Sequence, residues 1–298
     1  MDCTDKHERY FLRLISKNVL LYTEMIVSEA IDRGDRQKLL SFNLEEKPVA
    51  LQLGGSSPKL LSNASKIGEE FGYDEINLNL GCPSKKVQKN KFGACLIKEP
   101  KLVAECLSEM QSKTKLPVTV KTRIGYDQVE DYESLHNFIN LLKTTGVKTF
   151  IIHARKAMLG KFTPKQNLNI PPLKYEMVYK LKEDFKELNI IINGGITSSE
   201  QIKSHIKKVD GVMIGRSIYH SPYLLADIEK EIFKNEVVPS RQEVVEKLVI
   251  YLKNEIKKGT RVNQVMRHTL GLFHGQTGSN FWKRYLSENM CVRDADIQ

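Results

Sequence analysis

The stretch EINLNLGCPSKKVQKNKFGACLIKE, residues 75–99, begins as an alternating run and continues into a loop rich in lysine. Its first seven residues predict a β-strand, because apolar and polar side chains alternate and the run ends at a glycine. A single cysteine, Cys82, follows between Gly81 and Pro83. This thiol could be a core residue, a metal ligand or a reagent, and the surrounding chain must decide among these roles.

Short β-branched runs alternate with amphipathic segments over most of the chain. The predicted strands cover residues 18–25, 47–54, 75–81, 116–123, 148–155, 189–195 and 210–216. The segments between them have apolar residues spaced about 3.6 apart, and several end in glycine, as helices commonly do. Such alternation predicts parallel strands joined by crossover helices.

This pattern predicts an α/β fold of the (β/α)8 TIM-barrel type, which has eight strands. Seven strands are found, and the first predicted helix, TDKHERYFLRLIS, begins near residue 4. We therefore expect the first strand of the barrel to be missing from this chain. After residue 235 the pattern changes to three helical segments without strands. The predicted domains are a catalytic barrel over residues 1–235 and an all-helical domain over residues 236–298.

Composition narrows the class of partner. The 298 residues include 46 Lys+Arg and 36 Asp+Glu, a formal net charge of +10, which favours a polyanion such as RNA or DNA over a membrane surface. The five cysteines form no CxxC pair, so no metal site is predicted. No signal peptide or membrane-spanning run is apparent. We expect a cytoplasmic protein with reduced thiols and no membrane partner.

Polar side chains stand at nearly every predicted strand end, where TIM barrels carry their chemistry. They are Gln52, Asn77, Asn79, Cys82, Lys121, Arg123, His153, Arg155, Asn193 and Arg216. Each buried charge needs a partner, so this many polar groups on one rim favour a shared ligand site over separate structural roles.

The last two strand ends indicate the kind of ligand. NGGI, residues 193–196, and IGR, residues 214–216, contain glycines that let backbone N–H groups approach an anion, and Arg216 offers a bidentate fork. Lys121 and His153 can hydrogen-bond a flat heteroaromatic ring. A ring with a phosphate tail, in a chain without a GxGxxG motif, points to FMN.

In their order and spacing, the motifs resemble the tRNA-dihydrouridine synthase family, specifically its A subfamily. The resemblance spans essentially the whole chain and is carried by YTEM (22–25), NLNLGCPSKKVQ (77–88), FGACL (92–96), PVTVKTRIG (117–125), FIIHARKA (150–157), NIPPL (169–173), NGGI (193–196), DGVMIGR (210–216) and RHTLGLFHG (267–275). The chain departs from the subfamily's usual KxNREIPPL at Leu168 and Asn169.

The resemblance implies an oxidoreductase that uses FMN, with NADPH as electron donor, to reduce a uridine in the D-loop of tRNA, at position 20 or 20a, to 5,6-dihydrouridine. It implies FMN contacts at Gln52, Lys121, His153, Asn193, Gly194, Gly195, Gly215 and Arg216. It also implies a catalytic thiol at Cys82 and tRNA contacts at Asn79, Lys165 and Arg267. We expect a monomer.

This reaction gives Cys82 a role. Reducing the C5–C6 bond of uracil needs a hydride at C6, from reduced FMN, and a proton at C5. A cysteine with an ordinary pKa near 8.5 is mostly protonated at neutral pH and can donate that proton. We therefore interpret Cys82 as the proton donor and Cys95 as a packing residue. Lys85 and Lys86 could lower the pKa of the thiol, bind RNA phosphates or remain solvated.

Two alternatives stay open at this stage. The chain could be a flavin enzyme acting on a free pyrimidine, or an RNA-binding barrel whose flavin binding is impaired. In the helical domain, basic residues alternate with aromatic ones. We interpret Phe273, Phe281 and Trp282 as helical core and Lys283 and Arg284 as RNA contacts.

Overall fold

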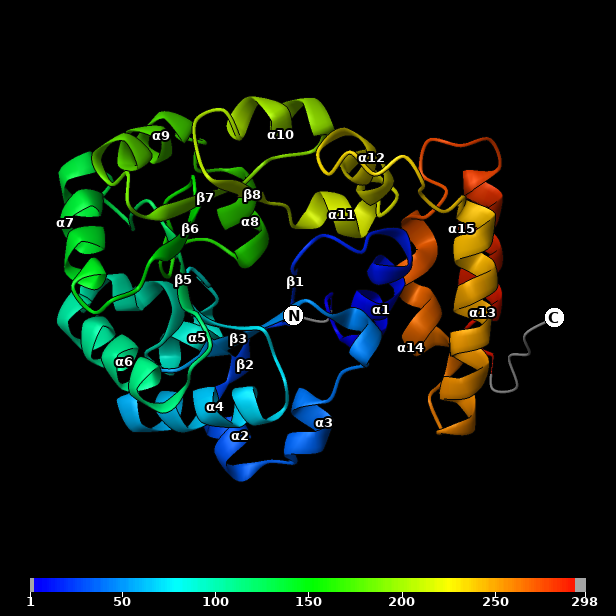
Figure 1. Ribbon diagram of the computed structural model, residues 1–298, viewed down its shortest axis with the longest axis horizontal. Helices are drawn as coiled ribbons and strands as arrows, with labels where there is room; N and C mark the ends of the chain where they lie inside the picture. The colour runs from blue at the N-terminus through cyan, green and yellow to red at the C-terminus, as the bar shows by residue number, and fades with distance from the viewer. Residues whose placement is uncertain (1–2, 293–298) are drawn as a thin grey trace.

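The computed structural model describes residues 3–292. A curled, all-parallel sheet occupies the larger part of the molecule, with helices around its outside and the C-terminal helices stacked at one end (Figure 1). The strands are β1 (Leu21–Tyr22), β2 (Ile26–Val27), β3 (Val49–Gly54), β4 (Glu75–Leu80), β5 (Val118–Arg123), β6 (Thr149–His153), β7 (Asn189–Asn193) and β8 (Gly211–Met213). All seven predicted strand regions therefore contain strand.

The first predicted strand is split into two short pieces. Both β1 and β2 pair with β3, with Leu21 opposite Val49 and Ile26 opposite Leu53, so together they fill one strand position. From β3 to β8 each strand pairs with the next along the chain. Among the strands of residues 3–292, no pairing joins β8 to β1, and the sheet is a barrel open along one seam. No strand precedes α1 within the described residues, as predicted.

Most of the helices that periodicity predicted lie where it placed them. They are α1 (Lys6–Ile15), α4 (Pro58–Glu70), α6 (Pro100–Lys113), α7 (Tyr132–Lys143), α10 (Ser199–His205), α13 (Arg241–Lys257) and α15 (Ser279–Asn289). Other helical elements, most of them short, were not predicted: α2 (Ser28–Arg33), α3 (Arg36–Leu40), η1 (Leu44–Glu46), α5 (Lys85–Lys89), η2 (Gly93–Lys98), α8 (Pro164–Asn169), α9 (Tyr175–Asp184), α11 (Arg216–His220) and α12 (Leu224–Glu231). The predicted helix over 260–275 is two pieces, α14 (Val262–Met266) and η3 (Arg267–Gly271).

The two faces of the sheet carry different chemistry. On β4, Ile76, Leu78 and Leu80 are fully buried, and Ile76 lies against Gly68 of α4 on the outer side. The alternate residues Asn77 and Asn79 are also buried but point into the barrel, since successive side chains on a strand face opposite ways. The apolar core therefore lies between the strands and the helices, and polar groups fill much of the barrel interior.

The C-terminal helices are anchored on the first helix of the chain. Tyr10 of α1 stacks on Tyr251 of α13 with 3.8 Å between ring centroids, and His7 Nδ1 lies 2.8 Å from the Tyr251 hydroxyl. Lys6 forms an ion pair with Glu255 at 3.2 Å. The three strandless helical segments predicted after residue 235 are thus present, while the boundary between two domains remains a prediction.

The interpretation of the aromatic residues in this region was partly wrong. Phe273 and Trp282 pack against the core with 5.0 Å between ring centroids, as predicted. Phe281, in contrast, is 64% exposed, because it lies on the face of α15 that points away from the packed helices. No helix within residues 3–292 has both the length and the apolar character needed to cross a membrane.

Candidate active site

Residues 81–84, which we call the Cys82 loop, follow β4 at the rim of the barrel, and the loop is held from two sides. Asn79 Oδ1 accepts the backbone N–H groups of Gly81 and Cys82 at 3.0 and 2.9 Å. The carbonyl of Cys82 accepts the N–H of Ala94 at 3.0 Å. Gly93 has a φ of +72°, and a Cβ there would lie 2.7 Å from that carbonyl, so only glycine fits. The half-buried thiol is therefore fixed at the carboxyl ends of the strands.

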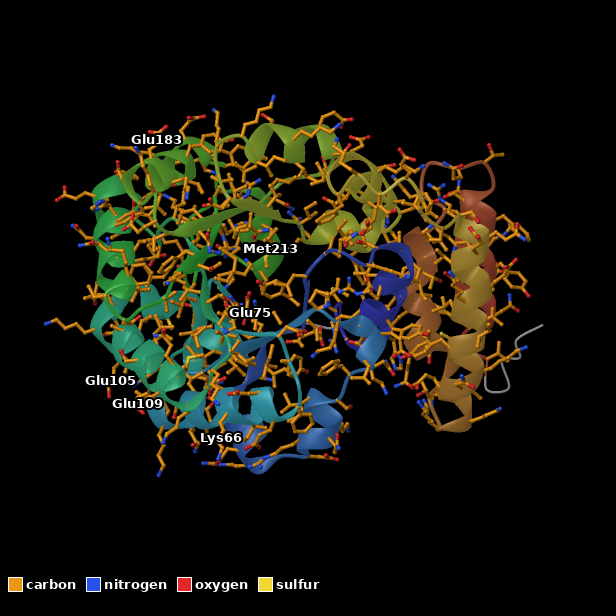
Figure 2. All side chains as sticks on the ribbon, viewed as in Figure 1. Lys66, Glu75, Glu105, Glu109, Glu183 and Met213 are labelled. Atoms are coloured by element: carbon orange, nitrogen blue, oxygen red, sulfur yellow. The ribbon has the colours of Figure 1, made fainter. Side chains whose placement is uncertain are left out.

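A lysine inside the barrel bridges distant strands. Lys121 Nζ donates to Asn193 Oδ1 at 3.0 Å, and Asn193 Nδ2 donates to the carbonyl of Met213 at 2.8 Å, which ties β5 to β7 and β8. Met213 is labelled towards the middle of the molecule in Figure 2. Burial, together with the nearby Arg123 guanidinium, lowers the pKa of Lys121 to about 8. The ammonium is thus a stronger acid than that of an ordinary lysine, and Lys121 lines the site.

His153 is an uncharged imidazole with one ring nitrogen that makes no hydrogen bond to the described residues. Its side chain is buried, and Nδ1 has no hydrogen-bond partner among the described residues. Burial and the positive charges of Arg123 and Lys121 lower the pKa of His153 to about 2, so the imidazole is uncharged at neutral pH. A buried ring nitrogen of this kind is available to a ligand.

Two consecutive glycines shape the rim after β7. Gly194 and Gly195 have φ values of +118° and +71°. A Cβ at Gly194 would lie 3.1 Å from His153, and one at Gly195 would lie 2.6 Å from Leu173. Only glycine therefore fits at either position, and of the two only Gly195 is exposed at the rim.

Lys121, His153, Gly194 and Gly195 line one cavity of about 650 Å³, and Gly81 of the Cys82 loop lines it too, whereas Cys82 itself does not. Of the eight predicted cofactor contacts, seven line it, namely Lys121, His153, Asn193, Gly194, Gly195, Gly215 and Arg216, whereas Gln52 does not line it and hydrogen-bonds Asn77. The cavity is large enough for a drug-sized ligand. The orphaned nitrogen of His153 and the glycine cradle together fit a flat ring with an anionic tail.

Arg216 does not point freely into this cavity. Its guanidinium donates to Asn169 Oδ1 at 2.8 Å and to the carbonyl of Leu168 at 3.2 Å, both on α8. A phosphate bound at the β8 end would therefore compete with α8 for the same fork. The predicted phosphate contact of Arg216 stays a prediction.

The three predicted tRNA contacts lie in three different places. Lys165 is exposed on α8, at the rim. Arg267 is partly exposed beside α1, where Nη2 donates to Asp5 Oδ2 at 2.7 Å. Asn79 is buried and holds the Cys82 loop. They form no single patch, and their contacts with RNA stay predictions.

Three residues of the site were given no role from the sequence. Arg123 Nε donates to the carbonyl of Gly81 at 2.8 Å and Nη1 to that of Lys156 at 3.0 Å, so it clamps the Cys82 loop to the loop after β6. His220 and His274 also line the cavity. Arg123 was visible as a charge at a strand end, but nothing in the periodicity marked the two histidines. His274 brings the C-terminal region to the cavity wall.

Comparison with known proteins gives the same picture along the full chain. The family model described as "Dihydrouridine synthase (Dus)" matches residues 1–298. A protein of Synechocystis sp. named tRNA-dihydrouridine(20/20a) synthase is 52% identical over 296 residues, covering 99% of this chain and 89% of that protein. One of the same name from Escherichia coli strain K12 is 50% identical over 299 residues, covering 100% of this chain and 86% of the relative.

Solved structures support the fold alone, because the sequence identities are low. A 2-naphthoyl-CoA reductase complex matches with a TM-score of 0.56 at 11% identity, over 76% of this chain and 47% of that chain. Morphinone reductase in complex with tetrahydroNAD matches with a TM-score of 0.52 at 10% identity, over 80% of this chain and 84% of that one.

Proposed function

The chain belongs to the dihydrouridine synthase family, and from this premise we propose that it reduces a uridine of tRNA to 5,6-dihydrouridine, at position 20 or 20a. The proposal rests on the family match over residues 1–298 and on the 50% and 52% sequence identity to two relatives named tRNA-dihydrouridine(20/20a) synthase. The net charge of +10 suits a polyanionic substrate and argues against a free pyrimidine.

We assign the cofactor role in the cavity to FMN, reduced in turn by NADPH. FMN would supply the hydride to C6 of uracil when bound. Lys121, His153 and Asn193 would hydrogen-bond its ring, and Gln52 is the remaining proposed FMN contact. The backbone at Gly194, Gly195 and Gly215, with Arg216, would hold the phosphate.

Cys82 is proposed to give its thiol proton to C5 of the uracil. This assignment is supported by the loop at the carboxyl end of β4, where Asn79 and Ala94 hold the backbone of Cys82 in place. A base stacked in tRNA cannot enter a barrel mouth, so the uridine must be extruded at a cost of a few kcal/mol. Asn79, Lys165 and Arg267 are the proposed tRNA contacts that offset this cost.

The direct test is to incubate the protein with FMN, NADPH and tRNA lacking dihydrouridine, and to locate the product by mass spectrometry of tRNA fragments. We expect dihydrouridine at position 20 or 20a and none from free uridine. NADPH oxidation without any product in tRNA would contradict the proposal. Added salt should weaken tRNA binding steeply, because Lys and Arg contacts release counterions.

A further inference from the structure

The interior of the barrel is unusually polar on the side of β3, β4 and β5. Branched apolar residues normally fill such an interior. Here it holds three carboxamides, Gln52, Asn77 and Asn79, and a threonine, Thr119, all of them buried. Buried amides are costly unless their groups are hydrogen-bonded, so a stack of this kind calls for an explanation.

These four side chains form one continuous series of hydrogen bonds, which we call the amide chain. Asn79 Nδ2 donates to Gln52 Oε1 at 2.7 Å, and Gln52 Nε2 donates to Asn77 Oδ1 at 3.0 Å. Asn77 Nδ2 donates to Thr119 Oγ1 at 2.8 Å. The strand register supports these links, since Asn77 lies directly opposite both Gln52 and Thr119.

The amide chain ends at a carboxylate at the amino end of β4. Thr119 Oγ1 donates to Glu75 Oε1 at 2.6 Å, and the hydroxyl of Tyr22 donates to the same oxygen at 2.7 Å. Glu75 is half-buried, and Figure 2 labels it towards the middle of the molecule, whereas Glu105 and Glu109 are labelled on the outer helices. The spacing of strand residues puts Glu75 about 20 Å from Cys82.

The groups at both ends of the amide chain require the same donor-to-acceptor direction of its hydrogen bonds. The N–H groups of Gly81 and Cys82 can only donate, so Asn79 must present its oxygen to them and its NH₂ group to Gln52. At the other end burial raises the pKa of the Glu75 carboxyl, and hydrogen bonds from Thr119 and Tyr22 to Oε1 oppose that shift. In its ionised form this carboxylate can only accept, so Thr119 donates to it. Every bond therefore points from the Cys82 loop towards Glu75.

We propose that Glu75 is a positioning residue for Cys82: it fixes the orientation of the amide chain and so holds Asn79 Oδ1 against the backbone of the Cys82 loop. If one amide of the chain turns over, the next must turn as well, or two donors will face each other. The last in the series is Asn79, whose NH₂ group would then meet the N–H groups of Gly81 and Cys82. The loop would lose both hydrogen bonds although neither of its own residues had changed.

The loop effect is tested by amide hydrogen exchange at residues 81 and 82, measured on the protein alone. Thr119→Val removes the hydroxyl link and preserves side-chain shape. We expect exchange at residues 81 and 82 to rise about three- to tenfold, in line with the modest net value of such hydrogen bonds. Thr122→Val is the matched control: Thr122 is buried on the same strand, and its hydroxyl donates only to the Arg123 carbonyl, at 3.4 Å. The control should leave the loop unchanged.

Glu75 itself is tested with a pair of variants. Glu75→Leu removes the acceptor and should accelerate exchange in the loop as Thr119→Val does. Glu75→Gln keeps an acceptor oxygen for Thr119 and should stay within about twofold of the unmodified protein. Unchanged exchange at residues 81 and 82 in Thr119→Val, or an equal rise along all of β4 and β5, would overturn the proposal.

The catalytic meaning of this inference rests on the proposed function, but the exchange measurement does not, so the two can fail separately. In single-turnover oxidation of reduced flavin by tRNA, Thr119→Val should slow the reaction about three- to tenfold and leave the dissociation constant for tRNA unchanged. A normal rate in a variant with a loosened loop would overturn the positioning role. A protein inactive on tRNA whose loop responds as expected would instead contradict the proposed function.

Discussion

The two halves of the barrel mouth differ in how completely their polar groups are satisfied. On the side of β3 to β5, the amide chain and the Cys82 loop form a closed network in which each link has a partner. On the side of β6 to β8, His153 Nδ1 has no partner among residues 3–292, and Gly195 is exposed at the rim.

This contrast indicates that the two halves of the site have different roles. A group that must deliver a proton benefits from being held in place before substrate arrives, because ordering it during the reaction would raise the barrier. A surface that must accept a large cofactor benefits from groups whose hydrogen bonds the ligand completes. The fixed half therefore suits chemistry, and the open half suits cofactor binding.

The largest expected effect is that of removing the proton donor from the fixed half. Cys82→Ala should slow oxidation of reduced flavin by tRNA roughly 10²- to 10⁴-fold, which is the usual value of a positioned general acid. FMN binding, tRNA binding and reduction of flavin by NADPH should continue. Single-turnover absorbance traces at saturating tRNA measure this directly.

Cys95→Ala is the matched control, because Cys95 lies on η2 with its thiol 3.1 Å from the carbonyl of Phe92. It should affect stability alone. A Cys82→Ala protein that reacts at the unmodified rate would exclude the donor role. Loss of all steps together would indicate packing instead.

The second effect concerns Lys121, which joins the two halves. Its pKa is about 8 in the folded protein, and the unfolded value is about 10.5, so between these values the unfolded chain binds more protons. Stability contributed by this site therefore rises with pH from about 8 to 10.5. Relative to Lys121→Met, the free energy of unfolding should gain up to about 3 kcal/mol across that window.

Urea titrations of both proteins at several pH values measure this difference, and the Met variant cancels the other groups that titrate in the same range. A constant difference between the two proteins would mean that the ammonium is not desolvated. Lys121 would then not be a buried link between the two halves, since its hydrogen bond to Asn193 would be that of an ordinary solvated lysine.

The sequence predicted the fold and most of the rim because both depend on local patterns. Alternation of strand and helix located all seven strand regions, and residues at strand ends fall on one rim whatever the loops do. Seven of the eight predicted cofactor contacts line the same cavity for this reason. The helices of five or six residues and the split of the first strand were missed because so short a run carries too little periodicity, and the longer α9 and α12 were missed as well.

The amide chain could not be predicted, for a different physical reason. Whether Asn77 meets Thr119 depends on the register of β4 against β5, and a shift by one residue would turn each side chain to the other face. Asn79 shows the consequence: the hydrogen bonds of its carboxamide to Gln52 and the Cys82 loop were not predicted, while its contact with tRNA stays a prediction. Phe281 was misplaced because apolar spacing does not show which face of a helix is covered.

The third effect concerns the positive charge of Arg216, which is proposed to bind the phosphate of FMN in the open half. Arg216→Ala should weaken FMN binding roughly 10- to 100-fold, because charge-assisted hydrogen bonds to phosphate are the stronger kind. Binding of riboflavin, which has no phosphate, should change little. Fluorescence titration of both ligands separates the two contributions. An equal loss for riboflavin and FMN would show that Arg216 supports the shape of the pocket and does not bind the phosphate.

The smallest effect has the opposite sign and uses one of the two contacts that hold Arg216 against α8. Arg216 donates to Asn169 Oδ1 at 2.8 Å, and a phosphate must compete with this oxygen for the guanidinium. Both side chains are exposed, so the bond is worth only about 0.2–1 kcal/mol. Asn169→Ala should therefore tighten FMN binding about two- to fivefold, without tightening riboflavin binding. The gain in FMN affinity should vanish when Arg216→Ala is added, because both substitutions act through the Arg216 guanidinium. Weaker FMN binding in Asn169→Ala would mean instead that α8 holds Arg216 in the orientation that the phosphate needs, and the open half would then be preorganised like the fixed one.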